Sequence, residues 1–304
     1  MTPAPRRGLD SIHPVALVLA AVVSVQFGGA LAVTLLPLVG VVGSVTLRLV
    51  LAAAVLWAIA RPRLRGRTRG DWATVGLFAL TLTAMNLAFY ASLERLPIGV
   101  AVTIEFLGPL VLAAATSRRG RDVAAVGAAL VGVLLISQAL TVPLAELDLV
   151  GIALAAAAGA CWAAYIILSG RTGARFEGLD GIAICMALGA LAMAPFGIWT
   201  AGPDLLTTEV LVRGIGIALL SSAIPYSLEL VALRRLAAGV FGVLLSLEPA
   251  VAALAGLVVL QQSLAPVQVV GMALVVAASV LVLGRRGSGT PGRPGPSRPP
   301  GRVS

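Results

Sequence analysis

Four charged side chains stand inside long apolar stretches of this sequence, where water cannot solvate them. They are Arg48, Glu105, Glu229 and Glu248. An ionised side chain in hydrocarbon costs several kcal/mol, and one that is retained usually marks a binding site or a proton pathway. A carboxylate in such a place can hold a substrate ammonium group or exchange a proton. These four residues are therefore the first candidates for substrate binding or proton coupling.

Two of the acids stand beside a proline. Glu105 is four residues before Pro109, and Glu248 directly precedes Pro249. Proline removes a backbone donor inside a helix, so we expect both helices to be bent or broken at these points. Pro225 predicts a bend in a third helix. The three prolines are candidates for helix breaks or gating.

The same stretch occurs twice in the chain. A shift of 140 residues aligns 91–109 (ASLERLPIGVAVTIEFLGP) with 231–249 (VALRRLAAGVFGVLLSLEP), and 7 of the 19 positions are identical. The second copy keeps the proline and carries its own acid, Glu248. The chain is therefore predicted to contain an internal duplication.

Several of these residues also have a structural interpretation. Counted along the helices, Arg48 and Glu105 fall roughly 10 Å below the outer boundary, so an ion pair between their helices explains them as well as substrate contact does. Glu229 is placed within about a turn of the inner surface, where it could reach interfacial water or Arg234; this structural interpretation is favoured. Further polar and aromatic residues near these depths could bind substrate or form interhelical hydrogen bonds: Gln26, Asn86, Tyr90, Trp162, Tyr165, Ser221, Ser222 and Tyr226.

The amino-acid composition indicates whether water or lipid surrounds the protein. The 304 residues are 59% hydrophobic and 12% charged, with a mean hydropathy of +1.02. A soluble domain carries about twice that share of charge, so the sequence predicts an integral membrane protein with the lipid bilayer as its partner. The arginines that give the net charge of +9 are dispersed over short loops, which argues against nucleic acid. No enzyme, metal or cofactor motif is present, so neither catalysis nor a cofactor is predicted.

Runs of about 18–25 apolar residues span a bilayer as helices, and the sequence predicts ten, hence an all-α membrane protein. The first five (14–36, 42–60, 72–93, 99–117, 122–140) form one repeat, 14–140. The other five (149–168, 180–200, 210–233, 239–261, 265–284) belong to a second repeat, 141–284. Residues 1–13 are predicted to be a cytoplasmic N-terminus. The Pro/Gly/Arg-rich residues 285–304 are predicted to be a disordered cytoplasmic tail.

Arginine placement predicts the orientation. With a cytoplasmic N-terminus, 19 arginines fall on the inner side, and only Arg95 and Arg213 fall in outer loops. Each repeat has an odd number of helices, so tandem copies must enter the membrane in opposite senses. This is the inverted repeat of many secondary transporters, which bind substrate near the midplane between the halves. Both termini are then cytoplasmic.

The motifs resemble a known family. EFLGP (105–109) and LEP (247–249), in ten helices, are similar to EamA-type transporters of the drug/metabolite transporter superfamily. Three longer segments resemble the bacterial threonine/homoserine exporter branch: NLAFYASLERLPIGVAVTIEFLGPL (86–110), GACWAAYIILSG (159–170) and ALLSSAIPYSLELVALRRL (218–236). The sequence departs from the family pattern around Gln262. At this place the family usually has a Gly-Glu-x-Leu-like stretch.

The resemblance implies a secondary exporter of small amino acids or related metabolites across the inner membrane, driven by the proton gradient through alternating access. Two alternatives stay open. One is an exporter of another metabolite or drug. The other is a non-transporting sensor or scaffold on the same fold, although four retained intramembrane charges favour transport. A homodimer is also left open.

Overall fold

The computed structural model describes residues 11–96, 98–116, 120–137, 140, 147–251, 254 and 265–283. Regular structure in these ranges is helical, as expected for an all-α protein. The predicted tail at 285–304, most of the predicted N-terminus and Gln262 lie outside the described residues.

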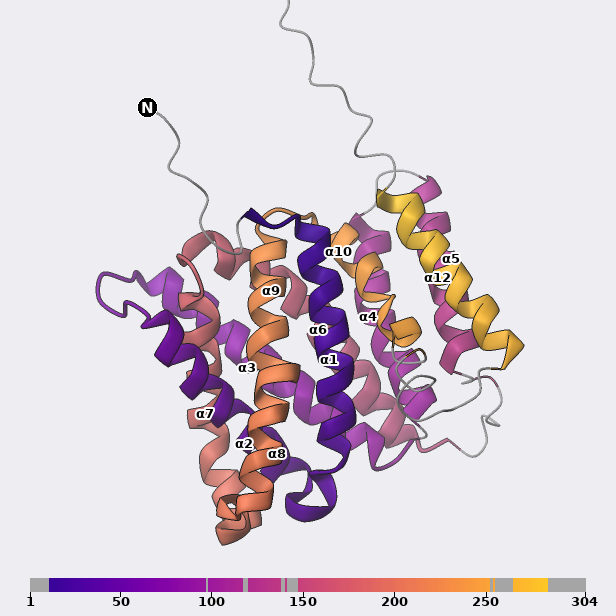
Figure 1. The fold of residues 1–304 in the computed structure, drawn as a ribbon. Coiled ribbons are helices and arrows are strands. Elements are labelled where there is room, and N and C mark those ends of the chain that lie inside the picture. Colours follow the sequence, from indigo (N-terminus) through magenta and orange to yellow (C-terminus); the bar gives the residue numbers. More distant parts are fainter. Residues whose placement is uncertain are drawn as a thin grey trace, which may run out of the picture.

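A helix lies in every predicted range (Figure 1). The elements are α1 (Pro14–Val33), α2 (Leu36–Ala60), α3 (Arg69–Leu93), α4 (Ile98–Thr116), α5 (Gly120–Ser137), α6 (Leu149–Arg175), α7 (Asp180–Ala201), η4 (Gly202–Leu206), α8 (Thr208–Ala218), η5 (Leu219–Ala223), α9 (Ile224–Leu233), α10 (Ala238–Leu245) and α12 (Pro266–Leu283).

Five helical segments are long and apolar enough to cross a membrane. They are Leu36–Ala60, Arg69–Leu93, Leu149–Arg175, Asp180–Leu206 and Thr208–Leu233. The other apolar helices among the described residues are shorter. The α1 helix begins and α12 ends on the same side of the bundle (Figure 1).

Local sequence explains several helix ends. The Thr68 side chain accepts from the Asp71 amide, and the Asp71 carboxylate accepts from the Thr68 amide, so a capping box starts α3. Asp148 caps α6 by accepting from the amides of Val150 and Gly151. These caps satisfy amides that have no acceptor in the first helical turn.

Interruptions of the helices differ from the sequence-based prediction. Of the bend or break expected at Pro109, the break is wrong, because α4 is one continuous helix that includes this proline. The break expected at Pro249 is present, because α10 ends at Leu245 and helical backbone resumes at 248. Before Pro225 the helix widens into the π-helical turn η5. An unpredicted kink occurs in α2 at Gly40, whose φ of 64° favours glycine.

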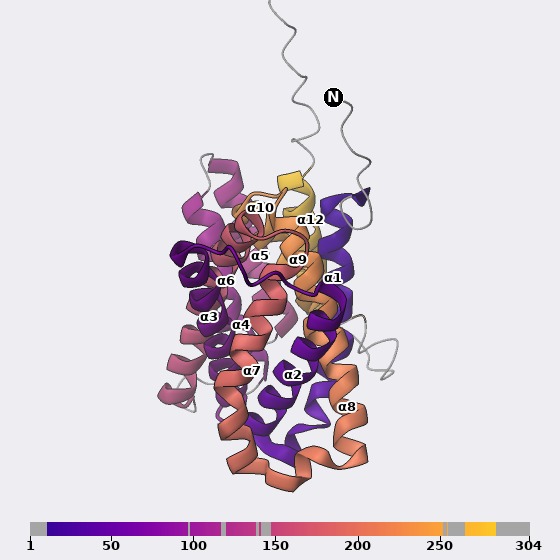
Figure 2. The ribbon, with the colours of Figure 1, turned by 90° about the vertical axis from the view of Figure 1, so that its left-hand side faces the viewer.

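The helices pack mainly between the two halves of the chain. The α2 helix lies against α7, α3 against α6, and α5 against α12, while α4 contacts α6 and α10, and α1 contacts α9. Figure 2 shows α7 and α8 joined across one end of the bundle by the segment that contains η4. The α4 and α6 helices approach closely at Gly108, where an added Cβ would lie 1.8 Å from the Gly159 carbonyl oxygen. Only glycine permits that contact.

Candidate functional site

Arg48 is the centre of a buried polar cluster. It lies in the middle of α2 with 7% of its surface exposed. Its Nε donates to Ser222 Oγ at 2.5 Å, and Nη2 donates to the Tyr226 hydroxyl at 2.8 Å and to the Ser221 carbonyl oxygen at 2.9 Å. Its Nη1 donates to the Tyr90 hydroxyl at 3.4 Å. One arginine from the first half thus holds the π-helical turn of the second half.

The sequence explains why that turn can accept these bonds. Pro225 has no N–H, so it cannot donate to the carbonyl of Ser221, four residues earlier. Arg48 donates to this oxygen instead. Short π-helical segments in longer helices are frequent at functional sites. The proline expected to bend the helix therefore supplies an acceptor for the buried guanidinium.

The ion pair between Arg48 and Glu105, one of two interpretations that the sequence left open, does not form, because no nitrogen of Arg48 lies within 4.0 Å of a Glu105 oxygen. The two groups remain near enough for electrostatic attraction. Equal depth on two helices allowed the pair, but the side chain of Arg48 turns toward η5 and α9. The interpretation in which this ion pair links α2 to α4 is therefore wrong. Arg48 instead connects α2 to the second half of the chain.

Glu105 is buried without a partner. It lies on α4 with 8% of its surface exposed, and its carboxylate accepts no hydrogen bond from the residues that the structure describes. Nearby, the Phe106 and Trp162 rings meet edge to face with centroids 4.8 Å apart. A buried carboxylate without a donor is costly unless it binds a proton or a cation. Glu105 is therefore the strongest candidate for contact with a ligand.

Glu229 has a different environment from the one predicted. It is 5% exposed and accepts from the Tyr165 hydroxyl at 2.6 Å. The expected reach to interfacial water is therefore wrong, because α6 covers the side chain. Arg234, named as its neighbour, donates to the carbonyl oxygens of Gly173, Phe176 and Gly178. The Tyr165 ring lies between Phe78 and Tyr226, with both centroids 5.5 Å away.

Glu248 lies where the helix resumes after the break. Gln26 Nε2 on α1 donates to its Oε2 at 3.4 Å. The carboxylates of Glu105 and Glu229 are near enough to interact electrostatically with Glu248. Glu248 thus lies near the acids of α4 and α9, and of these three acids Glu105 is the one that interacts electrostatically with Arg48.

The remaining candidates surround this cluster. Asn86 donates to the Leu82 carbonyl oxygen at 2.7 Å, and its side chain neighbours the Tyr226 hydroxyl. Trp162 contacts Phe106 rather than the Arg48 cluster. The sequence placed Gln26, Ser221 and Ser222 at the depth of the charged residues, but it did not distinguish ligand contact from interhelical hydrogen bonding for them. The position of Ser221, four residues before Pro225, was the available signal.

The structure thus defines a helical protein with a buried cluster of opposite charges, as expected of a membrane transporter, and the comparisons agree. Residues 149–284 match the EamA-like transporter family. The threonine/homoserine exporter RhtA of Escherichia coli (strain K12) is 39% identical over 267 residues, covering 88% of this chain and 90% of the relative. RhtA of Salmonella typhimurium (strain LT2) is 38% identical over 278 residues, covering 91% of this chain and 94% of the relative.

This chain belongs to the EamA-like transporter family and is a multi-pass membrane protein. Its relatives include the threonine/homoserine exporters that the sequence motifs resemble. A solved structure described as "Crystal structure of protein" is similar in fold, with a TM-score of 0.74 at 18% identity, covering 90% of this chain and 98% of the other.

Proposed function

We propose that this protein exports small amino acids of the threonine and homoserine type across the inner membrane. The unpartnered, buried carboxylate of Glu105 is the observation that carries this proposal. A proton or a substrate ammonium group would neutralise it. The 38–39% identity to threonine/homoserine exporters supports the choice of substrate.

A zwitterionic substrate suits the charges of the cluster. Its ammonium group would bind Glu105 or Glu248. Its carboxylate would bind near Arg48 or at the start of the helical segment at 248, since a helix N-terminus attracts anions. Of the four Arg48 hydrogen bonds, the 3.4 Å contact with Tyr90 is the longest, so it is the one that a substrate carboxylate would replace.

Coupling to the proton gradient follows from competition for one carboxylate. A proton that arrives from the outside neutralises Glu105 or Glu248 and releases the bound ammonium group. The emptied site then returns to the inner face and gives up its proton there. In this scheme Glu229, already bonded to Tyr165, is the less available carboxylate.

Alternating access would use ten membrane-spanning helices in two inverted halves, with both termini cytoplasmic. The packing supports this arrangement: α2 lies against α7, α4 against α10, and α5 against α12, and each pair joins helices in equivalent positions of the two halves. Such pairing is expected around a twofold axis between inverted repeats. The division at 14–140 and 141–284 is part of the same proposal.

The test is transport of labelled threonine and homoserine in proteoliposomes with an imposed pH gradient. Wild type should move both uphill, and Glu105→Gln should abolish uphill movement while remaining folded and inserted. Wild-type rates in the variant would make Glu105 structural and the mechanism wrong. If folded wild type moves neither substrate, the amino-acid assignment fails, and a broad metabolite and drug screen becomes the next experiment.

Other functions predict different results. A non-transporting sensor would bind ligand without net flux. A functional homodimer would lose activity when an inactive copy is mixed in. Both outcomes can be read from the same liposomes by comparing binding, flux and mixed populations.

A further inference from the structure

The π-helical turn η5 leaves two backbone carbonyls without their intrahelical donors. At the end of this turn the Ile224 amide donates to the Leu219 carbonyl oxygen, five residues back. The next donor along the chain would be residue 225, but Pro225 has no N–H. The carbonyl of Leu220 therefore lacks its donor in the π-helical pattern, and the carbonyl of Ser221 lacks its donor in the α-helical pattern.

Both carbonyls accept a hydrogen bond from a side chain of the first half of the chain. Ser24 Oγ on α1 donates to the Leu220 carbonyl oxygen at 2.7 Å. Arg48 Nη2 on α2 donates to the Ser221 carbonyl oxygen at 2.9 Å. A backbone carbonyl without a donor is costly inside a membrane. The two side chains therefore supply, from two different helices, the donors that the proline withholds.

The backbone of α1 lies close enough to the turn for the serine bond. A Cβ on Gly28 would lie 2.6 Å from the Ser221 amide nitrogen and 2.8 Å from the Leu220 carbonyl carbon. Gly28 follows Ser24 by four residues, so both lie on the same face of α1. A larger residue at position 28 would push α1 away from η5. The glycine thus permits the approach that brings the Ser24 hydroxyl to its acceptor.

The two donors are linked through the arginine that would bind substrate. Three of the four hydrogen bonds of Arg48 go to η5 and α9, and the fourth, to the Tyr90 hydroxyl, is the one that a substrate carboxylate would replace. Without Ser24, the Leu220 carbonyl would need another donor. The guanidinium already serves the adjacent carbonyl, so it is available to this one. Turning toward it would draw the guanidinium away from the substrate.

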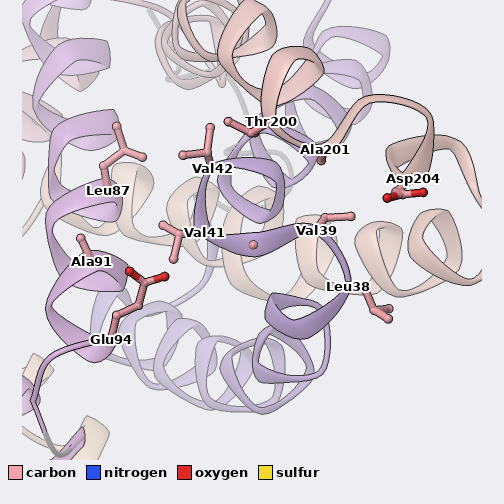
Figure 3. Close-up of a pocket in the computed structure, with 11 residues that line it drawn as sticks. Leu38, Val39, Val41, Val42, Leu87, Ala91, Glu94, Thr200, Ala201 and Asp204 are labelled. Atoms are coloured by element: carbon pink, nitrogen blue, oxygen red, sulfur yellow. The ribbon is translucent and has the colours of Figure 1, made fainter.

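Ser24 is separate from the cavity that lies beside α2. This cavity of about 550 Å³ is lined by 38–42, by the end of α3 and by 200–204 (Figure 3). Val42 in its wall precedes Arg48 by six residues, about 9 Å along α2. No described residue of α1 or η5 is among the lining residues. A molecule in this cavity would approach Arg48 along α2 and α3 without touching Ser24.

We propose that Ser24 is a positioning residue for substrate binding: by donating to the Leu220 carbonyl, it keeps the guanidinium of Arg48 directed at the substrate carboxylate. Ser24 acts through the turn and the arginine and does not contact the substrate. This role rests on the proposed export function and deepens it by assigning what orients the carboxylate subsite. An amine without a carboxylate gains nothing from it.

The first test asks whether Ser24 supplies the donor that Pro225 withholds. Melting temperatures in detergent are measured for wild type, Ser24→Ala, Pro225→Ala and the double variant. In the wild-type background, Ser24→Ala should lower the melting temperature by about 2–4 °C. In the Pro225→Ala background it should have no effect, because the new N–H at 225 can donate to the Leu220 carbonyl. Equal losses in the two backgrounds would overturn the proposal.

Ser279→Ala is the matched control for this test. The Ser279 hydroxyl also donates to a backbone carbonyl of another helix, that of Val243, at 3.4 Å. That carbonyl keeps the Ser246 amide as a donor, so it is not left without a partner. The melting temperature and the threonine KM of this variant should match those of wild type. A loss as large as that of Ser24→Ala would contradict a special role for Ser24.

The second test measures a property that a merely structural role would not change. In proteoliposomes, Ser24→Ala should raise the KM for threonine about tenfold, equivalent to ~1.4 kcal/mol, and leave the maximal rate unchanged. The inhibition constant of 1-aminopropan-2-ol, which is threonine without its carboxylate, should stay the same. Ser24→Thr keeps the hydroxyl and should restore the wild-type KM. Equal rises for threonine and for the amine would overturn the proposal.

The outcomes separate this proposal from the export function. If folded wild type moves neither threonine nor homoserine, the export function fails together with the substrate step that rests on it. Coupled stability losses in the first test would then still support Ser24 as the donor for the turn. If wild type exports threonine but the Ser24→Ala losses are the same with and without Pro225, the export function stands and the role of Ser24 is rejected.

Discussion

The two proline motifs have similar sequences but different structures. In the first half, α4 continues through Pro109, and Glu105 stands within an unbroken helix. In the second half, α10 ends at Leu245, four residues before Pro249, and Glu248 lies after the break. In each case the proline removes the donor for the carbonyl four residues earlier. The missing donor by itself therefore does not determine whether the main chain stays helical.

Close packing accounts for the intact helix. The carbonyl that Pro109 leaves without its donor belongs to Glu105, and a Cβ on Gly159 would lie 2.7 Å from that oxygen. The backbone of α6 therefore packs directly against the weakened turn. The consequence is that the two acids are presented differently: Glu105 lies within a continuous helix and has no hydrogen-bond partner among the described residues, whereas Glu248 lies where the helix resumes and is bonded to Gln26.

The largest difference between the halves should appear when each acid is neutralised. Glu105→Gln should abolish uphill threonine transport. Glu248→Gln should lower the transport rate by only about tenfold, because a glutamine at this position can still bond to Gln26. A tenfold change corresponds to ~1.4 kcal/mol. Initial rates under a pH gradient measure both. Equal losses in the two variants would mean that the unpartnered state of Glu105 is irrelevant.

Gly108→Ala should be the most damaging packing change. The new methyl group would lie 1.8 Å from the Gly159 carbonyl oxygen, so α4 and α6 must separate at a cost of about 1–3 kcal/mol. A lower melting temperature in detergent is the expected result. Gly127→Ala on α5 is the matched control, since nothing lies within 4 Å of its added Cβ. A variant as stable as wild type would rule out close packing as the reason that α4 stays intact.

The prolines themselves should differ in importance. Pro249→Ala restores a donor where α10 ends, so it should favour a continuous helix and slow transport by about threefold, or ~0.7 kcal/mol. Pro109→Ala should change the rate by less than that, because α4 is already continuous. Transport rates of both variants, measured under the same conditions, test this prediction. A greater loss of rate in Pro109→Ala than in Pro249→Ala would contradict it.

The smallest effect concerns the junction between the halves. Hydrogen bonding from Arg95, together with the amides of Gly151 and Val150, lowers the pKa of Asp148. Because the folded pKa lies below the unfolded value of about 3.9, the pair stabilises the protein above that value, and this contribution is lost as the pH falls through the lowered pKa. Arg95→Gln should flatten the acid side of the stability profile slightly. If the plots of stability against pH run parallel for the variant and the wild type, the exposed Arg95–Asp148 pair contributes nothing to stability.

Much of the fold could be predicted from the sequence. The structure has a helix in each range that hydropathy predicted, and the motifs identified the family. The buried charges at 48, 105, 229 and 248 could be found because an ionisable residue in an apolar run is conspicuous without any structure. Membrane crossing by all ten helices and the role of each acid remain predictions.

Tertiary structure decided how those residues are paired. Arg48 and Ser222 are 174 positions apart, and nothing local distinguishes that partner from Glu105 at a similar depth. Likewise, Pro109 and Pro249 weaken their helices in the same way, but glycines of two other helices, Gly159 of α6 and Gly242 of α10, pack closely against the main chain of the first motif. Hydrophobicity and backbone chemistry act within one helix and can be read along the chain. The direction of a buried side chain depends on helices that are distant in sequence, and only their packing determines it.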